Sequence, residues 1–93
     1  MPFVQKALQL DQTEWYIWDT RAEIFLNLGE FDKCISDCAK AISIKANGNS
    51  YLIRGLAHIK KGEKVKGCQD LSKAGELGEE LAYQKIKEYC NKK

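Results

Sequence analysis

The sequence predicts an all-α fold in which antiparallel helix pairs stack on one another. Apolar residues recur every three or four positions over several segments, and the alternating pattern of β-strands is absent. Gly29, Gly62 and Gly78 each follow such a segment, where glycine ends a helix by adopting a left-handed conformation without steric cost. Part of the sequence also recurs at a fixed spacing, which favours stacked repeats over a single closed bundle.

Size and composition are those of one folded domain. The 93 residues are 44% hydrophobic and carry a net charge of +2, whereas disordered chains combine low hydrophobicity with high net charge. No apolar run approaches the roughly 18 residues of a membrane span, and no secretory signal opens the chain. The basic run over residues 60–66 contains no aromatic side chain that could stack on bases. We therefore expect neither a membrane nor a nucleic-acid partner.

Each helix is predicted from its apolar spacing and its end signals. Asp11 and Glu14 have the spacing of a capping box, and Asn47 or Asn49 can cap the segment that follows them. The connections are short, so neighbouring helices should be antiparallel. The expected helices span residues 2–10, 13–28, 31–44, 49–61, 64–77 and 79–90.

Internal repetition is visible in three places. Residues 18–22 are echoed by residues 51–55, an offset of 33 positions. At the same offset Gly29 corresponds to Gly62, and Ala41 to Ala74. Upstream, residues 6–10 match residues 40–44 at an offset of 34. The chain therefore holds two complete units and a leading fragment.

The repeated unit resembles the tetratricopeptide repeat. That family's pattern is W-x2-L-G-x2-Y, then A-x3-F, then A and P, and the resemblance covers essentially the whole chain. Small residues in this pattern let paired helices approach closely. The first unit matches with Trp18, Ala22, Phe25, Gly29, Phe31, Cys34, Cys38 and Ala41, and the second with Tyr51, Gly55, His58, Gly62, Gly67, Leu71 and Ala74.

The chain departs from the family pattern at two kinds of position. Arg21 and Arg54 stand where the pattern has Leu, and we expect their stems to be packed and their guanidinium groups to be paired or solvated. Ala46 and Glu79 replace the closing Pro. His58 stands where the family pattern has an aromatic residue between the two helices of a repeat, so we expect His58 to be packed in the core.

The resemblance implies a short right-handed α-solenoid with a terminal capping helix. Residues 1–12 would be the second-helix fragment of a preceding repeat, residues 13–46 and 47–78 the two repeats, and residues 79–93 the capping helix and tail. Repeat arrays need such a cap, because the last pair would otherwise expose an apolar face. Leu81, Ala82, Ile86 and Tyr89 are expected to cover that face.

In this family the first helices line a groove that holds a peptide or helix of a partner protein. The resemblance therefore implies a non-catalytic protein-binding scaffold. Asp19 and Glu23 could either lie on a solvated face or attract a basic segment of the partner. Leu52, Leu56 and Ile59 could either pack against the terminal helix or contact the partner. The implied groove residues are Tyr16, Asp19, Glu23, Leu26, Asn27, Asn49, Leu52, Leu56, Ile59 and Lys60.

One variety of the family binds acidic chaperone tails through a clamp of Lys, Asn and Arg. Here Asp19, Glu23, Leu52 and Leu56 replace the cationic and amide groups that a carboxylate needs, so we do not expect this binding mode.

An alternative function is self-assembly through the start of the chain. Residues 1–10 lack the first helix of their repeat and carry apolar side chains on more than one side. The chain would then be a structural module that forms a homo-oligomer, or a fragment of a longer array. Phe3, Val4 and Leu8 are the expected self-association residues.

The four cysteines are expected to be buried free thiols. Cys34 and Cys38 lie four positions apart on one helix, where a disulfide would be strained. His58 is the only histidine and there is no CxxC pair, so we expect no metal and no cofactor. No catalytic constellation is present, and we expect no enzyme activity. Free thiols and the lack of an export signal favour a cytoplasmic location.

Overall fold

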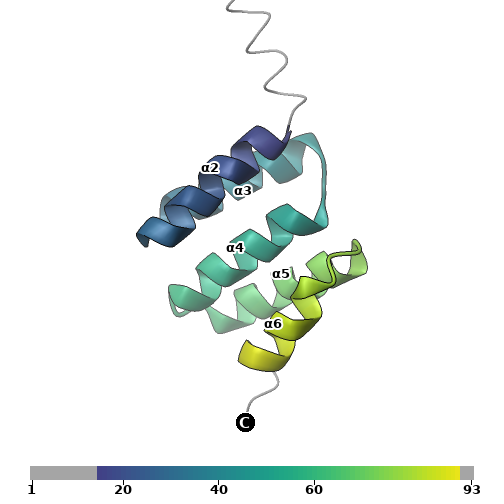
Figure 1. Ribbon diagram of the computed structural model, residues 1–93. Helices are drawn as coiled ribbons and strands as arrows, with labels where there is room; N and C mark the ends of the chain where they lie inside the picture. The colour runs from purple at the N-terminus through teal and green to yellow at the C-terminus, as the bar shows by residue number, and fades with distance from the viewer. Residues whose placement is uncertain (1–14, 91–93) are drawn as a thin grey trace, which may run out of the picture.

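The computed structural model describes residues 15–90, and the described chain is helical without strands (Figure 1). The expected helix over residues 2–10 and the capping box at Asp11 and Glu14 lie outside the described residues. The other predicted helices are confirmed within about two residues at each end. The helices are α2 (Trp15–Leu28), α3 (Phe31–Ile44), α4 (Gly48–Lys60), α5 (Lys64–Glu76) and α6 (Leu81–Tyr89).

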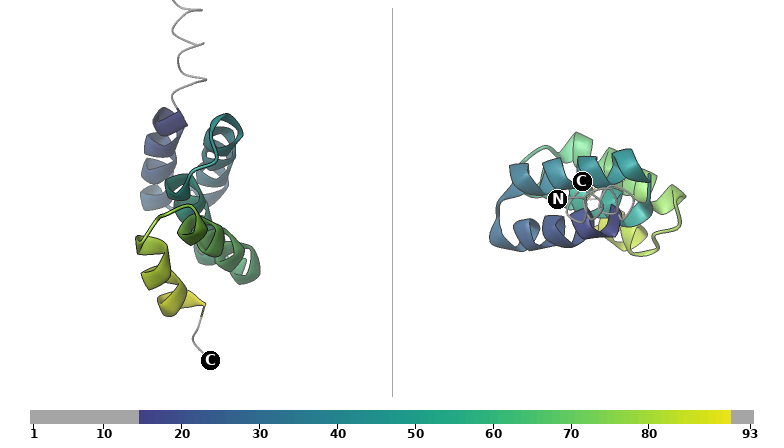
Figure 2. Two further views of the ribbon diagram at one scale, coloured as in Figure 1. Left: turned by 90° about the vertical axis from the view of Figure 1, so that its right-hand side faces the viewer. Right: turned by 90° about the horizontal axis from the view of Figure 1, so that it is seen from above.

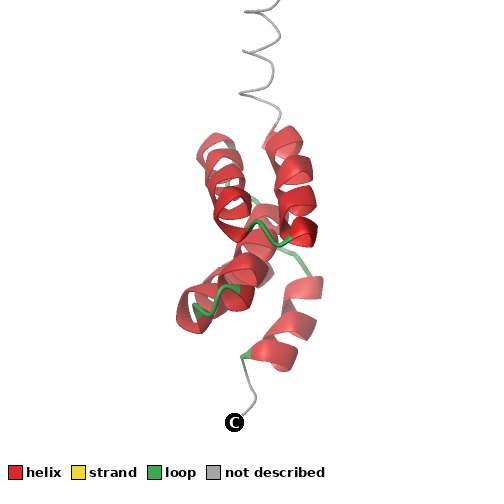
Figure 3. Ribbon diagram, turned by 90° about the vertical axis from the view of Figure 1, so that its left-hand side faces the viewer, coloured by secondary structure: helices red, strands yellow, loops and turns green. Residues whose placement is uncertain are grey.

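The helices lie in two layers. Helices α2, α4 and α6 form one layer, and α3 and α5 form the other (Figures 2 and 3). Each helix packs chiefly on its neighbours in the sequence, most extensively within the pairs α2–α3 and α4–α5, and α2 also contacts α4. The fold is therefore all-α, with antiparallel helix pairs stacked as a short tetratricopeptide-like repeat and closed by α6. No helix among the described residues has the length and apolar character needed to cross a membrane.

Glycine ends three of the helices in the same way. Gly29, Gly62 and Gly78 have φ angles of 80°, 97° and 97°. In each case the next residue donates its backbone N–H to a carbonyl five positions earlier, at 2.9, 2.7 and 3.0 Å. This is the bond pattern that satisfies the last carbonyls of a helix, and it confirms the predicted ends. At the start of α4, Asn47 is the cap: its side chain accepts from the Ser50 N–H at 2.8 Å.

The core consists of two clusters that share α4. The first joins α2, α3 and α4, and the second joins α4, α5 and α6. Most of the buried side chains are small, which lets the helices pack closely. The buried members are Ala22, Cys34, Cys38, Ile53 and Ala57 in the first cluster, and Leu52, Leu71, Ala74 and Ala82 in the second.

Arg21 and Arg54, which stand where the tetratricopeptide pattern has leucine, form the same contact in each repeat. Arg21 donates from Nε to Asp37 at 2.7 Å, and Arg54 donates from Nε to Asp70 at 2.8 Å. A second bond from Nη2 measures 2.9 Å in both pairs. Each guanidinium also lies over the aromatic ring three positions earlier, 5.3 Å from the Trp18 centroid in the first repeat. The expectation of paired guanidinium groups is confirmed.

The two ion pairs differ in their surroundings. The Arg21 side chain is 58% exposed, whereas that of Arg54 is 24% exposed. Arg54 lies on α4, which packs against both α3 and α5, whereas Arg21 lies on α2, which packs chiefly on α3. The two pairs are thus matched in geometry and different in burial.

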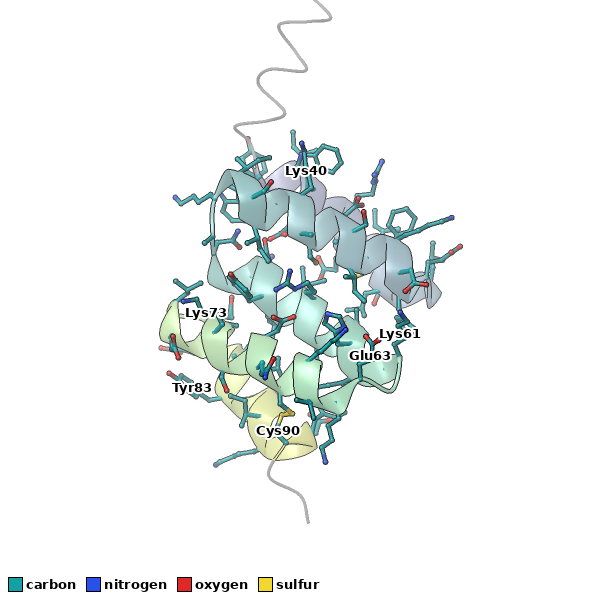
Figure 4. The ribbon with its side chains drawn as sticks, turned by 180° about the vertical axis from the view of Figure 1, so that it is seen from behind. Lys40, Lys61, Glu63, Lys73, Tyr83 and Cys90 are labelled. Atoms are coloured by element: carbon teal, nitrogen blue, oxygen red, sulfur yellow. A yellow bond between two sulfur atoms is a disulfide. The ribbon has the colours of Figure 1, made fainter. Side chains whose placement is uncertain are left out.

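One expectation about the cysteines is wrong. Cys68 and Cys90 form a disulfide, with their Cα atoms 5.9 Å apart (Figure 4). The antiparallel arrangement of α5 and α6 brings the end of α6 beside the first turns of α5, which spacing along the chain does not reveal. Cys34 and Cys38 are free and buried, as predicted.

The capping helix covers the last repeat with fewer residues than predicted. Ala82 is fully buried in the second cluster, and Ile86 packs against it. Leu81 is instead 45% exposed at the start of α6. The cap therefore depends on the middle and the end of a short helix.

Candidate functional site

The predicted groove residues divide into exposed and covered members. Those on α2 and α4 lie in the layer that also contains α6 (Figure 2). Leu26, Leu56 and Ile59 are partly buried, while Asp19 and Leu52 are buried. We call the exposed members the α2–α4 surface: Tyr16, Glu23, Asn27, Asn49 and Lys60.

Asp19 fits neither of the two alternatives, a solvated residue or one that attracts a basic partner segment. Its side chain neither faces solvent nor is placed to attract a partner, because Asp19 is only 3% exposed. It accepts hydrogen bonds from Ser50 Oγ at 2.5 Å and from Asn49 Nδ2 at 2.9 Å. Asp19 therefore joins α2 to α4 and orients Asn49 on the α2–α4 surface.

Burial gives Asp19 a measurable influence on stability. Desolvation raises its pKa above the ordinary value of 3.8, against the opposing effect of the hydrogen bonds from Ser50 and Asn49. The folded state thus binds this proton at a higher pH than the unfolded state does.

We expect the stability of the wild type, relative to Asp19→Asn, to rise as the pH falls from about 7 to about 3. A group whose pKa is raised on folding contributes stability below its unfolded pKa and loses it as the pH rises through its folded pKa. Urea unfolding of both proteins across this range measures the difference. A difference that stays constant with pH, or shrinks as the pH falls, contradicts the prediction.

The apolar part of the predicted groove is largely occupied by the protein itself. Leu52 lies in the second cluster with Leu71 and Ala82, and Leu56 and Ile59 pack against that cluster. Leu52 is thus packed in the cluster to which the terminal helix contributes, which is the first of the two alternatives. We call Leu52, Leu56 and Ile59 the α4 strip.

His58 is packed and paired, as expected for its position. Its Nδ1 lies 2.7 Å from Glu63 Oε1, and its Nε2 lies 3.8 Å from Asp70 Oδ2. The hydrogen bond to His58 lowers the pKa of Glu63, and nearby lysines act in the same direction. Lys61 lies beside Glu63 at the turn between α4 and α5 (Figure 4) and also bonds Asp32 at 2.6 Å. These contacts fix the turn.

Within residues 15–90, no three His, Cys, Asp or Glu side chains are grouped in a way that could hold a metal ion.

A second exposed surface was not predicted from the sequence. Ile17, Ile24 and Leu28 form an apolar stripe on α2, which we call the stacking face. Ile24 is 52% exposed, whereas Ala57, its equivalent in the second repeat, is fully buried in the cluster to which α3 contributes. The repeat offset could have indicated this surface. It relates Ile24 to Ala57, and α3 packs over Ala57 whereas no described helix packs over Ile24. The predicted self-association residues Phe3, Val4 and Leu8 lie outside the described residues.

Two curated plant proteins are similar to this chain in sequence. It is 31% identical over 87 residues to Hsp70-Hsp90 organizing protein 1 of Glycine max, which is 92% of this chain and 15% of that protein. It is 40% identical over 37 residues to an Hsp70-Hsp90 organizing protein of Triticum aestivum, which is 40% of this chain and 6% of that protein. The chain thus corresponds to a small part of each relative. No known family's sequence profile matches it, and neither does any solved structure.

Proposed function

We propose that this chain is a non-catalytic scaffold that binds a peptide or helix of a partner protein across the α2–α4 surface. The observation that carries the proposal is that side chains from two successive repeats are exposed together in one layer, while the Asp19 bonds to Asn49 and Ser50 fix the position of α2 against α4. A rigid surface of this kind binds an extended segment with little loss of its own conformational freedom. The names of the two relatives describe proteins that organise other proteins, which supports a protein partner.

The chemistry of the surface indicates what kind of segment fits. Glu23 is exposed on α2 and Lys60 on α4, with the partly buried Leu26 and Leu56 on the same two helices. We propose a segment with apolar anchors, a basic group near Glu23 and an acidic group near Lys60. A tail that is acidic throughout does not fit, because Glu23 would repel it.

Charge reversal tests this proposal without disturbing the core. We expect the double variant Glu23→Lys/Lys60→Glu to weaken binding by at least about tenfold, with unchanged helicity. The matched control is Lys66→Glu/Glu76→Lys, which makes the same exchange on the exposed face of α5. A partner is captured with the wild type and identified, and its affinity for all three proteins is then measured by titration. Equal affinity for both variants would exclude the α2–α4 surface.

Self-assembly is a second candidate function, and the stacking face favours it. Apolar patches of this kind are uncommon on monomers. We expect Ile24→Asp to shift any oligomer of the full chain to monomer, as measured by light scattering over a range of concentrations, and Val65→Asp on α5 to leave it unchanged, since Val65 is also exposed. A wild type that is monomeric at every concentration would rule out this function.

A further inference from the structure

We propose that the Cys68–Cys90 disulfide is a redox latch that controls access to the α4 strip, so that the reduced protein offers an apolar binding site which the oxidised protein covers. The inference rests on the proposed function, because it names the regulation of the same partner-binding layer. It concerns the part of that layer nearest to α6.

The two ends of α6 are held by different kinds of contact. Before its start, the Glu79 N–H bonds the Ala74 carbonyl at 3.0 Å, which ties the turn to α5. In its first turn, Tyr83 Oη donates to the Gly75 carbonyl at 3.1 Å (Figure 4). Its last residues are held by the packing of Ile86 and by the disulfide at Cys90. The disulfide therefore holds the end of α6 farthest from its anchored start.

Helix α6 depends on these contacts because it is short. It has 9 residues, whereas isolated helices below about 12 residues are marginal in water. Cys90 and Ile86 pack against the cluster that contains Leu52 and Leu71. When the covalent link is removed, we expect the last turns of α6 to separate from α5 and uncover this cluster.

The chemistry of the latch is thiol–disulfide exchange with a dithiol reductant. One thiolate of the reductant attacks a sulfur of the disulfide and forms a mixed disulfide, and the other sulfur leaves as a thiolate that takes up a proton. The second thiol of the reductant then displaces the remaining cysteine. The protein gains two electrons and two protons, and the reductant becomes a disulfide. Cys68 and Cys90 are both only partly buried, so a reductant has access to the sulfurs.

The uncovered residues match the chemistry of a binding site. Leu56 and Ile59 are already partly exposed in the oxidised protein, and Leu52 lies one turn before Leu56 on the same helix. The α4 strip lies on the same helix as Asn49 and Lys60, so a segment bound on the α2–α4 surface can extend over it. The occupant that we propose is an apolar stretch of the same partner segment.

Hydrogen exchange of the full chain tests the latch without a partner. We expect the amides of α6 to exchange at least about tenfold faster after reduction by a dithiol, with those of α2 and α3 unchanged. Cys90→Ser should exchange rapidly at α6 with or without the dithiol. Unchanged exchange of α6 on reduction would overturn the latch, and so would an equal acceleration in every helix.

A fluorescent dye that binds apolar surface provides the second measurement. Dye binding should increase on reduction of the wild type and should be high in Cys90→Ser, and adding Leu56→Gln to Cys90→Ser should lower it. No increase on reduction would overturn the inference. The charge-reversed α2–α4 variant should keep the full dye response, so failure of the proposed function and failure of the latch give different results.

Discussion

Replacing Arg54 with leucine is expected to lower the free energy of unfolding by about 3 kcal/mol, whereas the same change at Arg21 should cost about 1 kcal/mol. Both arginines make two hydrogen bonds to one aspartate. The loss of Arg54 leaves the carboxylate of Asp70 buried without its counter-charge. The loss of Arg21 opens Asp37 to water, since the Arg21 side chain is itself 58% exposed.

Denaturant unfolding followed by circular dichroism measures both costs. The double variant Arg54→Leu/Asp70→Leu is the control, because removing both charges should recover much of the stability lost by removing one. Equal losses at Arg21 and Arg54 would show that the burial of the arginine does not determine the strength of the pair.

Gly67→Ala is expected to destabilise the protein by about 2 kcal/mol. A methyl group at this position would lie 2.7 Å from the Gly55 carbonyl oxygen and would overlap Ile59. The backbones of α4 and α5 cross here at a distance that only glycine permits, so the helices would have to separate. The sign of the effect is diagnostic, because alanine usually stabilises a helix by up to about 1 kcal/mol relative to glycine.

Gly75→Ala is the matched control within the same helix. Its new methyl group would meet the ring of Tyr83 at 3.0 Å, and that side chain, which is 56% exposed, can turn away at the cost of its hydrogen bond to the Gly75 carbonyl. We expect a change of less than about 1 kcal/mol. If Gly67→Ala instead raises the unfolding free energy in the same denaturation experiment, the close crossing of α4 and α5 does not limit the packing.

The helices could be predicted because their signals are local. Apolar spacing predicts where the described helices lie, and the glycines at 29, 62 and 78 predict where α2, α4 and α5 end, and the structure confirms both. The repeated Arg–Asp ion pair could also have been predicted, because Arg21 and Arg54 are separated by the same number of positions as Asp37 and Asp70. The shared offset of 33 positions pairs each arginine with its aspartate.

The errors arise where contacts depend on tertiary structure. Asp19 has the position of a solvated residue on α2, and only the approach of Asn49 and Ser50 from α4 buries it. Cys68 and Cys90 meet because α6 folds back along α5. Neither the Asp19 hydrogen bonds nor the disulfide can be predicted from the spacing of these residues along the chain.

The disulfide also bears on the expected cytoplasmic location. That expectation rests in part on four free thiols, and only Cys34 and Cys38 are free in the described chain. Structural disulfides are typical of oxidising compartments, whereas a redox-responsive disulfide can function in a reducing one. The hydrogen-exchange experiment therefore also bears on which compartment suits the protein.

The order of packing along the chain has a consequence for folding kinetics. Each described helix packs mainly on its sequence neighbour, so the contact order is low, and such chains fold within microseconds to milliseconds. Among the described helices, α4 alone contributes to both clusters, with Ile53 in one and Leu52 in the other. Folding can therefore begin in either helix pair, and it spreads to the other pair only through α4.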